Sequence, residues 1–248
     1  YATSLPCFLY IYRMAFRFKQ FTIDDSACPM KVGTDSVLLG SWADFSQSTE
    51  ILDIGTGSGL LALMAAQQSQ SNITAIEIDE SSVKTAVCNF QTSPWPHKFS
   101  TFHISLQDFC RQAIPGSFNH IITNPPYFIN SLKSPEPTRS HARHNDLLSF
   151  EALAFCASLL LAKGGLLSMV LPVKEAAIFL AQAEVHHLHL NRRLDIIPRE
   201  GKPANRILFE FCKNQQQPLQ AQQLSIRHQS GEYTDEYKSL TAAFYLHF

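Results

Sequence analysis

Short apolar runs that alternate with longer helix-like segments constrain the fold of this sequence more than any other feature. From Glu50 onward, strand-like runs recur over residues 51–54, 73–78, 101–105, 119–123, 166–171, 188–197 and 206–211. Helix-like segments lie over residues 34–45, 58–68, 80–91, 147–162 and 173–183. Strands that alternate with helices in this way form parallel sheets with helices on both faces. The pattern predicts an α/β, Rossmann-like domain with a seven-stranded sheet, and the glutamine-rich residues 214–223 as a connector.

The first strand of this series ends in Asp53 and Ile54 and continues into a glycine loop, Gly55-Thr56-Gly57-Ser58-Gly59. Glycines at alternate positions let the chain turn sharply and let a ligand approach the backbone without a Cβ in the way. Dinucleotide-binding loops instead space their glycines as G-x-G-x-x-G and bind a pyrophosphate. An acid at the position of Asp53 would repel a pyrophosphate, but it suits the ammonium group of S-adenosyl-L-methionine. We therefore expect this molecule as the cofactor.

Acidic residues after the next two strands are candidates for other contacts with the same cofactor. Glu77 ends the second strand, 24 residues after Asp53, where a carboxylate can accept hydrogen bonds from both ribose hydroxyls. After the third strand, Asp108 is the candidate for the adenine amino group of the cofactor. Capping of a helix is the alternative role of Asp108.

The fourth strand runs into Asn124-Pro125-Pro126-Tyr127, at the carboxyl edge where α/β sheets bind ligands. A conjugated amino nitrogen is a poor nucleophile because its lone pair is delocalised. Two hydrogen-bond acceptors would free that pair, and the Asn124 side-chain oxygen and the Pro125 carbonyl can supply them. Tyr127 offers a ring on which a base can stack. We predict a methyl-transfer loop that works by orientation and needs no metal; the motif alone leaves adenine, guanine, cytosine and glutamine amides open as targets.

Four segments together resemble a known family: Met30 to Trp42, the glycine loop with Asp53, Gln91 to Trp95, and the catalytic loop. They are closely similar to the bacterial enzymes that methylate N6 of adenine-37 in a valine tRNA, and the resemblance runs from about residue 16 to the C-terminus. It implies a seven-stranded class I methyltransferase fold and S-adenosyl-L-methionine as the methyl donor. It also implies that the substrate is a tRNA, bound through its anticodon stem-loop.

The resemblance further implies that Lys31, Gly33 and Thr34 cover the cofactor from the N-terminal side. From the residues alone, the segment that contains Lys31, Gly33 and Thr34 is typical of a turn and the start of a helix, with Thr34 as the N-cap. One departure concerns Leu106, which stands where relatives carry an acid.

Two groups of basic residues are candidates for contacts with tRNA phosphates. The first follows the catalytic loop and comprises Lys133, Arg139 and Arg143, with His141 and His144 between and beside them; the second comprises Arg192, Arg193, Arg199, Lys202 and Arg206. Arg206 precedes an apolar strand, so its alternative role is structural. The histidines at 186, 187 and 189 alternate between the faces of a strand-like run and are not expected to bind a metal.

Composition places further bounds on the protein. The formal net charge is -1, so a site for nucleic acid must be a local patch. The six cysteines show no metal-binding spacing, which predicts reduced thiols and a cytoplasmic protein. No apolar run reaches the roughly 18 residues of a membrane-spanning helix. We expect no membrane contact, a monomer, a native start at Met14, an N-terminal extension over residues 1–33 and a methyltransferase domain over residues 34–248.

Three alternatives remain open for the activity. A protein methyltransferase acting on N5 of glutamine can use the same loop, because a side-chain amide presents the same activation problem; its substrate would be a release factor. A ribosomal-RNA or DNA amino-methyltransferase shares the chemistry, although such enzymes often carry an extra recognition domain. The non-enzyme alternative is a catalytically silent RNA-binding module, against which the intact Asn124 and glycine loop argue.

Overall fold

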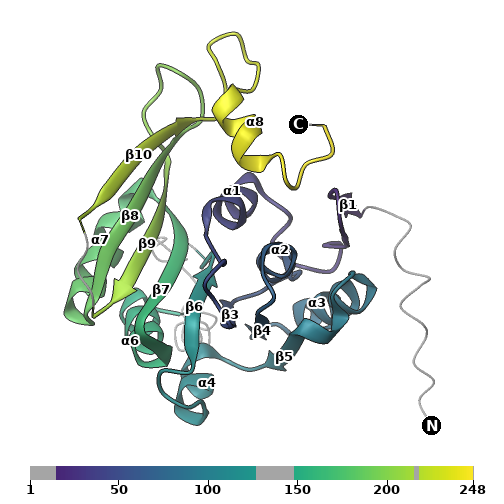
Figure 1. The fold of residues 1–248 in the computed structure, drawn as a ribbon, viewed down its shortest axis with the longest axis vertical. Helices are drawn as coiled ribbons and strands as arrows, with labels where there is room; N and C mark the ends of the chain where they lie inside the picture. Colours follow the sequence, from purple (N-terminus) through teal and green to yellow (C-terminus); the bar gives the residue numbers. More distant parts are fainter. Residues whose placement is uncertain (1–14, 127–147, 215–217, 248) are drawn as a thin grey trace, which may run out of the picture.

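A sheet of eight strands organises the part of the chain that the computed structural model describes, residues 15–126, 148–214 and 218–247 (Figure 1). Its order is β10-β8-β9-β7-β6-β3-β4-β5. The strands are β3 (Glu50–Ile54), β4 (Asn72–Glu77), β5 (Phe99–His103), β6 (Phe118–Thr123), β7 (Leu161–Pro172), β8 (Leu188–Ile197), β9 (Arg206–Lys213) and β10 (Gln220–Ser225). A two-stranded sheet of β1 (Phe16–Arg17) and β2 (Thr22–Ile23) precedes them.

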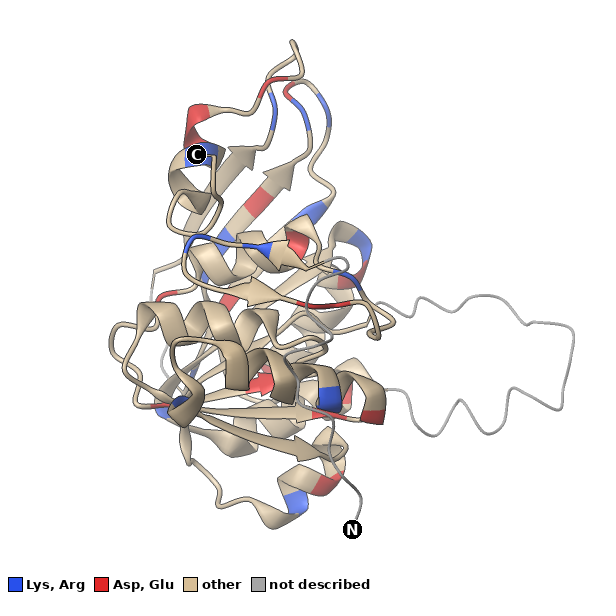
Figure 2. Ribbon diagram, turned by 90° about the vertical axis from the view of Figure 1, so that its right-hand side faces the viewer, with Lys and Arg blue, Asp and Glu red and all other residues tan. Residues whose placement is uncertain are grey.

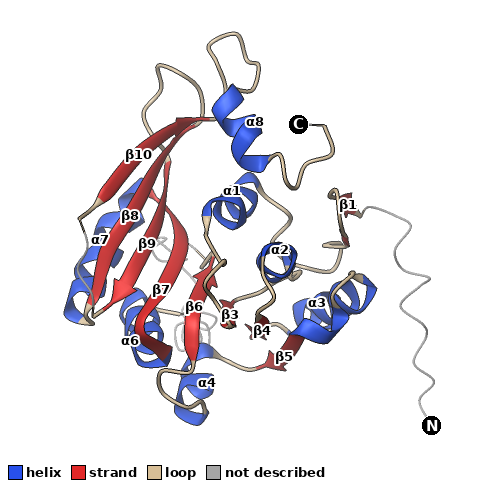
Figure 3. Ribbon diagram, in the orientation of Figure 1, coloured by secondary structure: helices blue, strands red, loops and turns tan. Residues whose placement is uncertain are grey.

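Helices cover both faces of the large sheet, as Figure 3 shows. One face carries α1 (Thr34–Trp42), α2 (Leu60–Gln68), α3 (Glu80–Thr92) and α8 (Asp235–Thr241), and the other carries α4 (Leu106–Gln112), α6 (Phe150–Leu160) and α7 (Val173–Val185). Successive strand residues serve opposite faces: Ile51 belongs to the core of the first face and Leu52 to the core of the second. The predicted Rossmann-like α/β class with helices on both faces is confirmed.

The strand order creates one crevice at the centre of the sheet. The central strand β3 pairs in parallel with β4 on one side and with β6 on the other. The chain therefore leaves β3 in one direction and returns to build the sheet in the other, which makes the boundary between β3 and β6 a topological switch point. Ligands of open α/β sheets bind outside the carboxyl ends of the strands at such a point. The glycine loop follows β3 there and Asn124 follows β6.

Three elements differ from the sequence-based prediction. Residues 220–223 of the predicted connector belong to β10, which pairs in parallel with β8 and raises the number of strands from seven to eight. Only Leu224 of this edge strand is buried, so its backbone pairing leaves no apolar period in the sequence. Helix α4 was not predicted, and β7 begins at Leu161, where the preceding helix was expected to continue.

The two ends of the described chain meet on one side of the molecule. The backbone N–H of Lys19 donates to the Phe244 carbonyl at 2.8 Å, and Phe18 stacks with Tyr245 at a ring-centroid distance of 6.0 Å. Phe18, Phe21 and Ile23 are buried in the same core as α1 and α2. The described part of the N-terminal extension therefore packs as part of the main body. Among the described helices, none has the length and apolar character needed to cross a membrane.

Candidate active site

The glycine loop leaves the end of β3 in a conformation that favours glycine. Gly55, Gly57 and Gly59 have φ angles of 68°, 56° and 89°, in the left-handed region that costs other residues energy. The N–H groups of Gly55 and Thr56 donate to the Ile76 carbonyl at 2.9 and 3.1 Å, which holds the loop against β4. A Cβ on Gly55 or Gly57 would meet no atom of the described residues within 4 Å. The space above these two glycines is therefore open to a ligand.

Asp53 lies beneath this loop and is fully buried. Its Oδ2 accepts hydrogen bonds from Thr56 Oγ1 at 2.6 Å and from the Ala62 N–H at 3.2 Å. Its Oδ1 is buried and has no hydrogen-bond partner in the described structure. Burial raises the pKa of Asp53 to about 7, the bonds from Thr56 and Ala62 act in the opposite direction, and the nearby Glu77 adds to the rise. Asp53 thus joins the glycine loop to α2, while its contact with a cofactor ammonium stays a prediction.

Glu77 ends β4 directly beside the loop. Its Oε2 accepts a hydrogen bond from the Gly57 N–H at 3.0 Å, and its Oε1 accepts from the N–H groups of Ile78 and Asp79 at 2.8 and 3.0 Å. Three backbone donors therefore fix a half-buried carboxylate at the rim of the open space. This position suits the predicted contact with ribose hydroxyls.

A hollow of about 500 Å³ adjoins Glu77 at the carboxyl ends of β4 and β5; it is lined by Ile78, His103, Ile104, Ser105, Gln107, Asp108 and Arg111. The Asp108 carboxylate accepts from Ser105 Oγ at 2.8 Å and pairs with Arg111. Ser105, and not Asp108, is the N-cap of α4. Leu106 points into the core, with 5% of its surface exposed. Asp108 thus lines this hollow with a carboxylate that is already bonded to Ser105 and Arg111, and its contact with an adenine amino group stays a prediction.

Asn124 follows β6, whose Thr123 pairs with Ile54 of β3. The Thr123 Oγ1 donates to the Ile54 carbonyl at 2.8 Å, so the ends of the two strands are fixed to each other. The Asn124 Nδ2 donates to Ser36 Oγ at 2.9 Å. Pro125 is buried and Pro126 is exposed, while Tyr127 lies outside the described residues. The register thus brings Asn124 next to the glycine loop, as the sequence predicts.

The segment before α1 is fixed by hydrogen bonds among its own residues. Lys31 Nζ donates to the carbonyls of Asp25 and Ser26 at 2.7 and 2.9 Å, and the Asp25 carboxylate accepts from the Val32 N–H at 2.7 Å. The N-cap of α1 is Gly33, not Thr34, which is the first helical residue. The extended backbone of Gly33 turns the chain into the helix with no capping side chain. Contact of Lys31, Gly33 and Thr34 with a cofactor stays a prediction.

Asn89 of α3 connects this segment to the glycine loop and was missed by the sequence analysis. Its Nδ2 donates to the carbonyls of Asp24 and Ser58, both at 2.8 Å, and its Oδ1 accepts from the Asp24 N–H at 2.9 Å. Its 4% exposure is unusual for an asparagine. A polar residue of poor helix propensity inside an otherwise regular helix was the only available signal, and no motif marks it.

The comparisons with known proteins agree on one family. A family model described as methyltransferase small domain matches residues 28–189. A protein named tRNA1(Val) (adenine(37)-N6)-methyltransferase from Shewanella sp. (strain MR-4) is 43% identical over 234 residues, which are 94% of this chain and 99% of that protein. A protein of the same name from Bacteroides thetaiotaomicron is 43% identical over 236 residues, 94% of this chain and 97% of that one. The chain belongs to this methyltransferase family.

A solved structure supports the fold of this methyltransferase. The crystal structure titled as a predicted O-methyltransferase from Agrobacterium tumefaciens matches it with a TM-score of 0.68 at 20% identity, over 85% of this chain and 96% of that one. The residues of the site also fit S-adenosyl-L-methionine, on which the family implies dependence. The open space above Gly55 and Gly57, the fixed carboxylate of Glu77 and the unpartnered buried oxygen of Asp53 all lie at the carboxyl ends of β3 and β4.

The basic residues that the sequence analysis assigned to tRNA have varied surroundings in this methyltransferase. Three arginines of the second group have a carboxylate partner: Arg192 pairs with Glu210 at 2.9 Å, Arg193 with Asp195 at 2.8 Å and Arg206 with Asp35 at 2.7 Å. Arg192 also lies 4.3 Å from the centroid of the Trp42 ring. Lys202 is exposed. Figure 2 shows basic and acidic residues interleaved along the described chain, so contact of the second group with phosphates stays a prediction.

The first basic group, Lys133, Arg139 and Arg143, lies outside the described residues. Within the described ranges, no group of three or more His, Cys, Asp or Glu side chains is arranged to hold a metal ion.

Proposed function

We propose that this chain transfers a methyl group from S-adenosyl-L-methionine to N6 of adenine-37 in the anticodon loop of a valine tRNA. The observation that carries the proposal is the pairing of β3 with β6, which sets Asn124 beside the glycine loop. The proteins of the named activity that are 43% identical over 94% of the chain support this substrate.

The residues of the site divide the work between holding the cofactor and orienting the target. The glycine loop and Glu77 would hold S-adenosyl-L-methionine, which supplies an electrophilic methyl group. The Asn124 Oδ1 accepts a hydrogen bond from one N6 hydrogen of the adenine, and the Pro125 carbonyl accepts the other. Two acceptors draw the nitrogen out of conjugation and fix its lone pair in one direction. Catalysis then comes mainly from the orientation of the amino group towards the methyl group. Such orientation can lower a reaction barrier by up to about 7–11 kcal/mol.

The proposal extends to the setting of the reaction. A tRNA substrate favours a cytoplasmic enzyme, and the described cysteines, Cys28, Cys88, Cys110, Cys156 and Cys212, form no disulfide with one another, as in a reducing compartment. We also propose that the protein acts as a monomer, because the site is built from elements of one chain; light scattering after size-exclusion chromatography tests this.

Labelled S-adenosyl-L-methionine tests the substrate. The protein is incubated with bulk tRNA, release-factor protein and ribosomal RNA, each from cells that lack the gene. We expect label in tRNA, recovered after nucleoside digestion as N6-methyladenosine, and a loss of that label with Asn124→Ala. Label in release factor alone would support the glutamine methyltransferase, and label in ribosomal RNA alone a ribosomal enzyme; either result would refute the proposed substrate.

A further inference from the structure

The hydrogen bond between Asn124 and Ser36 joins the catalytic loop to α1, across 88 residues of sequence. Ser36 lies in the first turn of α1 and is half-buried, and its Oγ is 2.9 Å from the Asn124 Nδ2. A side-chain amide has two unlike ends, a carbonyl oxygen that only accepts hydrogen bonds and an NH2 group that only donates them. The orientation of the Asn124 amide therefore decides whether a target amino group meets the carbonyl oxygen or the NH2 group.

We propose that Ser36 is a positioning residue that fixes the amide of Asn124 with its Oδ1 towards the target amino group. This inference rests on the proposed function as an amino-methyltransferase. The Ser36 hydroxyl accepts a hydrogen bond from Nδ2 and so occupies the donating end of the amide. Rotation of the amide by about 180° would break this bond. The Ser36 hydroxyl could then donate to Oδ1, but two N–H donors of Asn124 would face the N–H donors of the target, which stabilises neither partner.

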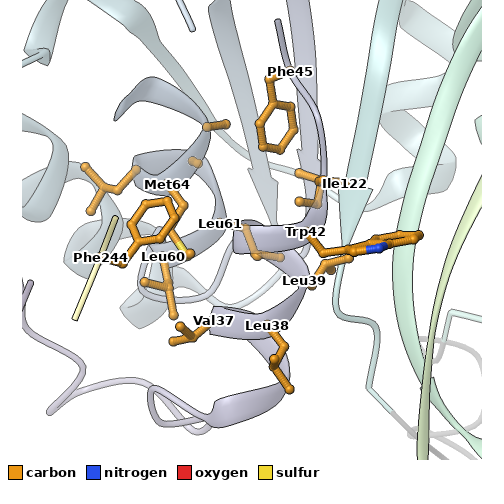
Figure 4. Packing of buried hydrophobic residues seen from close by; sticks show 14 of the residues in the cluster. Val37, Leu38, Leu39, Trp42, Phe45, Leu60, Leu61, Met64, Ile122 and Phe244 are labelled. Atoms are coloured by element: carbon orange, nitrogen blue, oxygen red, sulfur yellow. The ribbon is translucent and has the colours of Figure 1, made fainter. Parts of the chain in front are cut away.

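The backbone of Ser36 is well placed to hold a side chain still. The next three residues, Val37, Leu38 and Leu39, are buried, and Figure 4 shows α1 beside α2, with Val37 near Leu60. Gly40 allows a close approach between the two helices, because a Cβ there would be 2.5 Å from the Met64 sulfur. The preceding residue, Asp35, pairs with Arg206 of β9 at 2.7 Å. The first turn of α1 is therefore fixed to the sheet on one side and to α2 on the other.

Three variants test the role of Ser36. Ser36→Ala removes the acceptor, and we expect kcat to fall roughly tenfold, the usual effect of one hydrogen bond on a barrier, with KM for S-adenosyl-L-methionine within about twofold of wild type. Ser36→Thr keeps the hydroxyl and should restore most of the rate. Ser41→Ala is the matched control, because Ser41 lies on the same helix and its buried Oγ has no hydrogen-bond partner in the described structure. It should retain the wild-type kcat.

The assay uses whichever of the tRNA, release-factor and ribosomal-RNA pools accepts label from the wild-type protein. An error in the proposed substrate is therefore seen with the wild type alone and leaves the comparison of variants intact. An unchanged kcat in Ser36→Ala would overturn the inference, as would a loss seen only in the KM for S-adenosyl-L-methionine. An equal loss in Ser41→Ala would also overturn it, because the effect would then belong to α1 as a whole.

A double substitution separates positioning through Asn124 from a direct role of Ser36. If Ser36 acts through the amide, Ser36→Ala should change the residual rate of Asn124→Ala by less than about twofold, because residues that act as a unit are not additive. A further tenfold loss in the double variant would show that Ser36 acts by another route.

Discussion

Asp53 illustrates, at the scale of one residue, how burial gives a side chain a role that its motif does not reveal. The sequence suggests an acid that faces a ligand. In the fold the carboxylate lies under the glycine loop, bonded to Thr56 and Ala62, and its burial raises its pKa from 3.8 to about 7. The carboxylate that hydrogen-bonds to the glycine loop and to α2 therefore also titrates near neutral pH.

The stability of the protein should depend on the titration of Asp53. Because its pKa is higher in the folded protein than in the unfolded chain, the folded protein keeps a proton that the unfolded chain has lost. The stabilising effect is full below about pH 4 and is lost as the pH rises through about 7, by up to about 1.4 kcal/mol per pH unit. Urea unfolding at pH 5, 6, 7 and 8 should therefore show wild type losing stability relative to Asp53→Asn.

The control for this experiment is Asp235→Asn, which removes a carboxylate whose side chain is 93% exposed. Its free energy of unfolding should follow that of the wild type across the pH range. A constant difference between wild type and Asp53→Asn would contradict the prediction.

Asn124 should matter for turnover and little for the cofactor. Asn124→Ala removes the side-chain acceptor and keeps the glycine loop and Glu77, which hydrogen-bond to each other through the Gly57 N–H. We expect turnover to fall by at least about a hundredfold, the scale of a lost transition-state contact, and the Kd for S-adenosyl-L-methionine from calorimetry to change by less than about threefold. Normal turnover in this variant would remove Asn124 from its catalytic role.

At the scale of secondary-structure elements, the start of α2 depends on its packing against α3. Gly59 is the N-cap of α2 with a φ of 89°, and a Cβ there would lie 2.5 Å from the Phe90 ring. The left-handed conformation alone costs an alanine about 1–2 kcal/mol. The close approach to Phe90 adds the cost of moving a buried aromatic side chain.

The contribution of this close packing can be measured with a matched pair of substitutions. Gly201 has a φ of 80° but its added Cβ would meet only Gln229 at 3.7 Å. Gly59→Ala should destabilise the protein by about 1–3 kcal/mol more than Gly201→Ala, the typical cost of overpacking. Equal midpoints of urea unfolding for the two variants would contradict this prediction, because they would show that α2 can move away from Phe90 of α3 without loss of stability.

At the scale of the whole molecule, the C-terminal segment completes the core around α1 and α2. Phe244 is 1% exposed and lies in that core in Figure 4, more than 170 residues from Met64 in sequence. Phe244→Ala should reduce the free energy of unfolding by about 3–5 kcal/mol. Leu246→Ala, at a site that is 48% exposed, should cost less than about 1 kcal/mol. Similar losses in both variants, measured by urea unfolding, would contradict a specific role for Phe244.

Binding of tRNA also belongs to this scale, because the formal net charge of -1 gives no general attraction. If Lys202 contacts a phosphate, Lys202→Ala should reduce the slope of log K against log salt concentration by about 0.7–0.9. Lys84→Ala is the control, since Lys84 is exposed and pairs with Glu80 at 2.7 Å on α3. A slope for Lys202→Ala equal to that of the wild type would exclude this contact.

Much of the fold was accessible from local pattern. The run from Ile51 to Gly59 predicted a strand, a glycine loop and a helix, and the structure has β3, the loop and α2 there. The edge strand β10 escaped prediction because its glutamines are exposed and its pairing with β8 is made by backbone groups that all residues share. Helix α4 is short, at 7 residues, and too brief to show a period.

The sequence by itself determined seven of the eight strands of the large sheet, the glycine loop and the position of the Asn124 loop after a strand, because periodicity and turn chemistry operate over a few neighbouring residues. Only the tertiary structure decided that Asp53 lies beneath the loop, that Arg206 pairs with Asp35, and that Asn124 donates a hydrogen bond to Ser36. These contacts depend on which distant segments the packing of α1 and the pairing of β3 with β6 bring together. No local sequence pattern predicts the contacts of Arg206 with Asp35 and of Asn124 with Ser36, because each partner is an ordinary polar residue and the two lie far apart in the sequence.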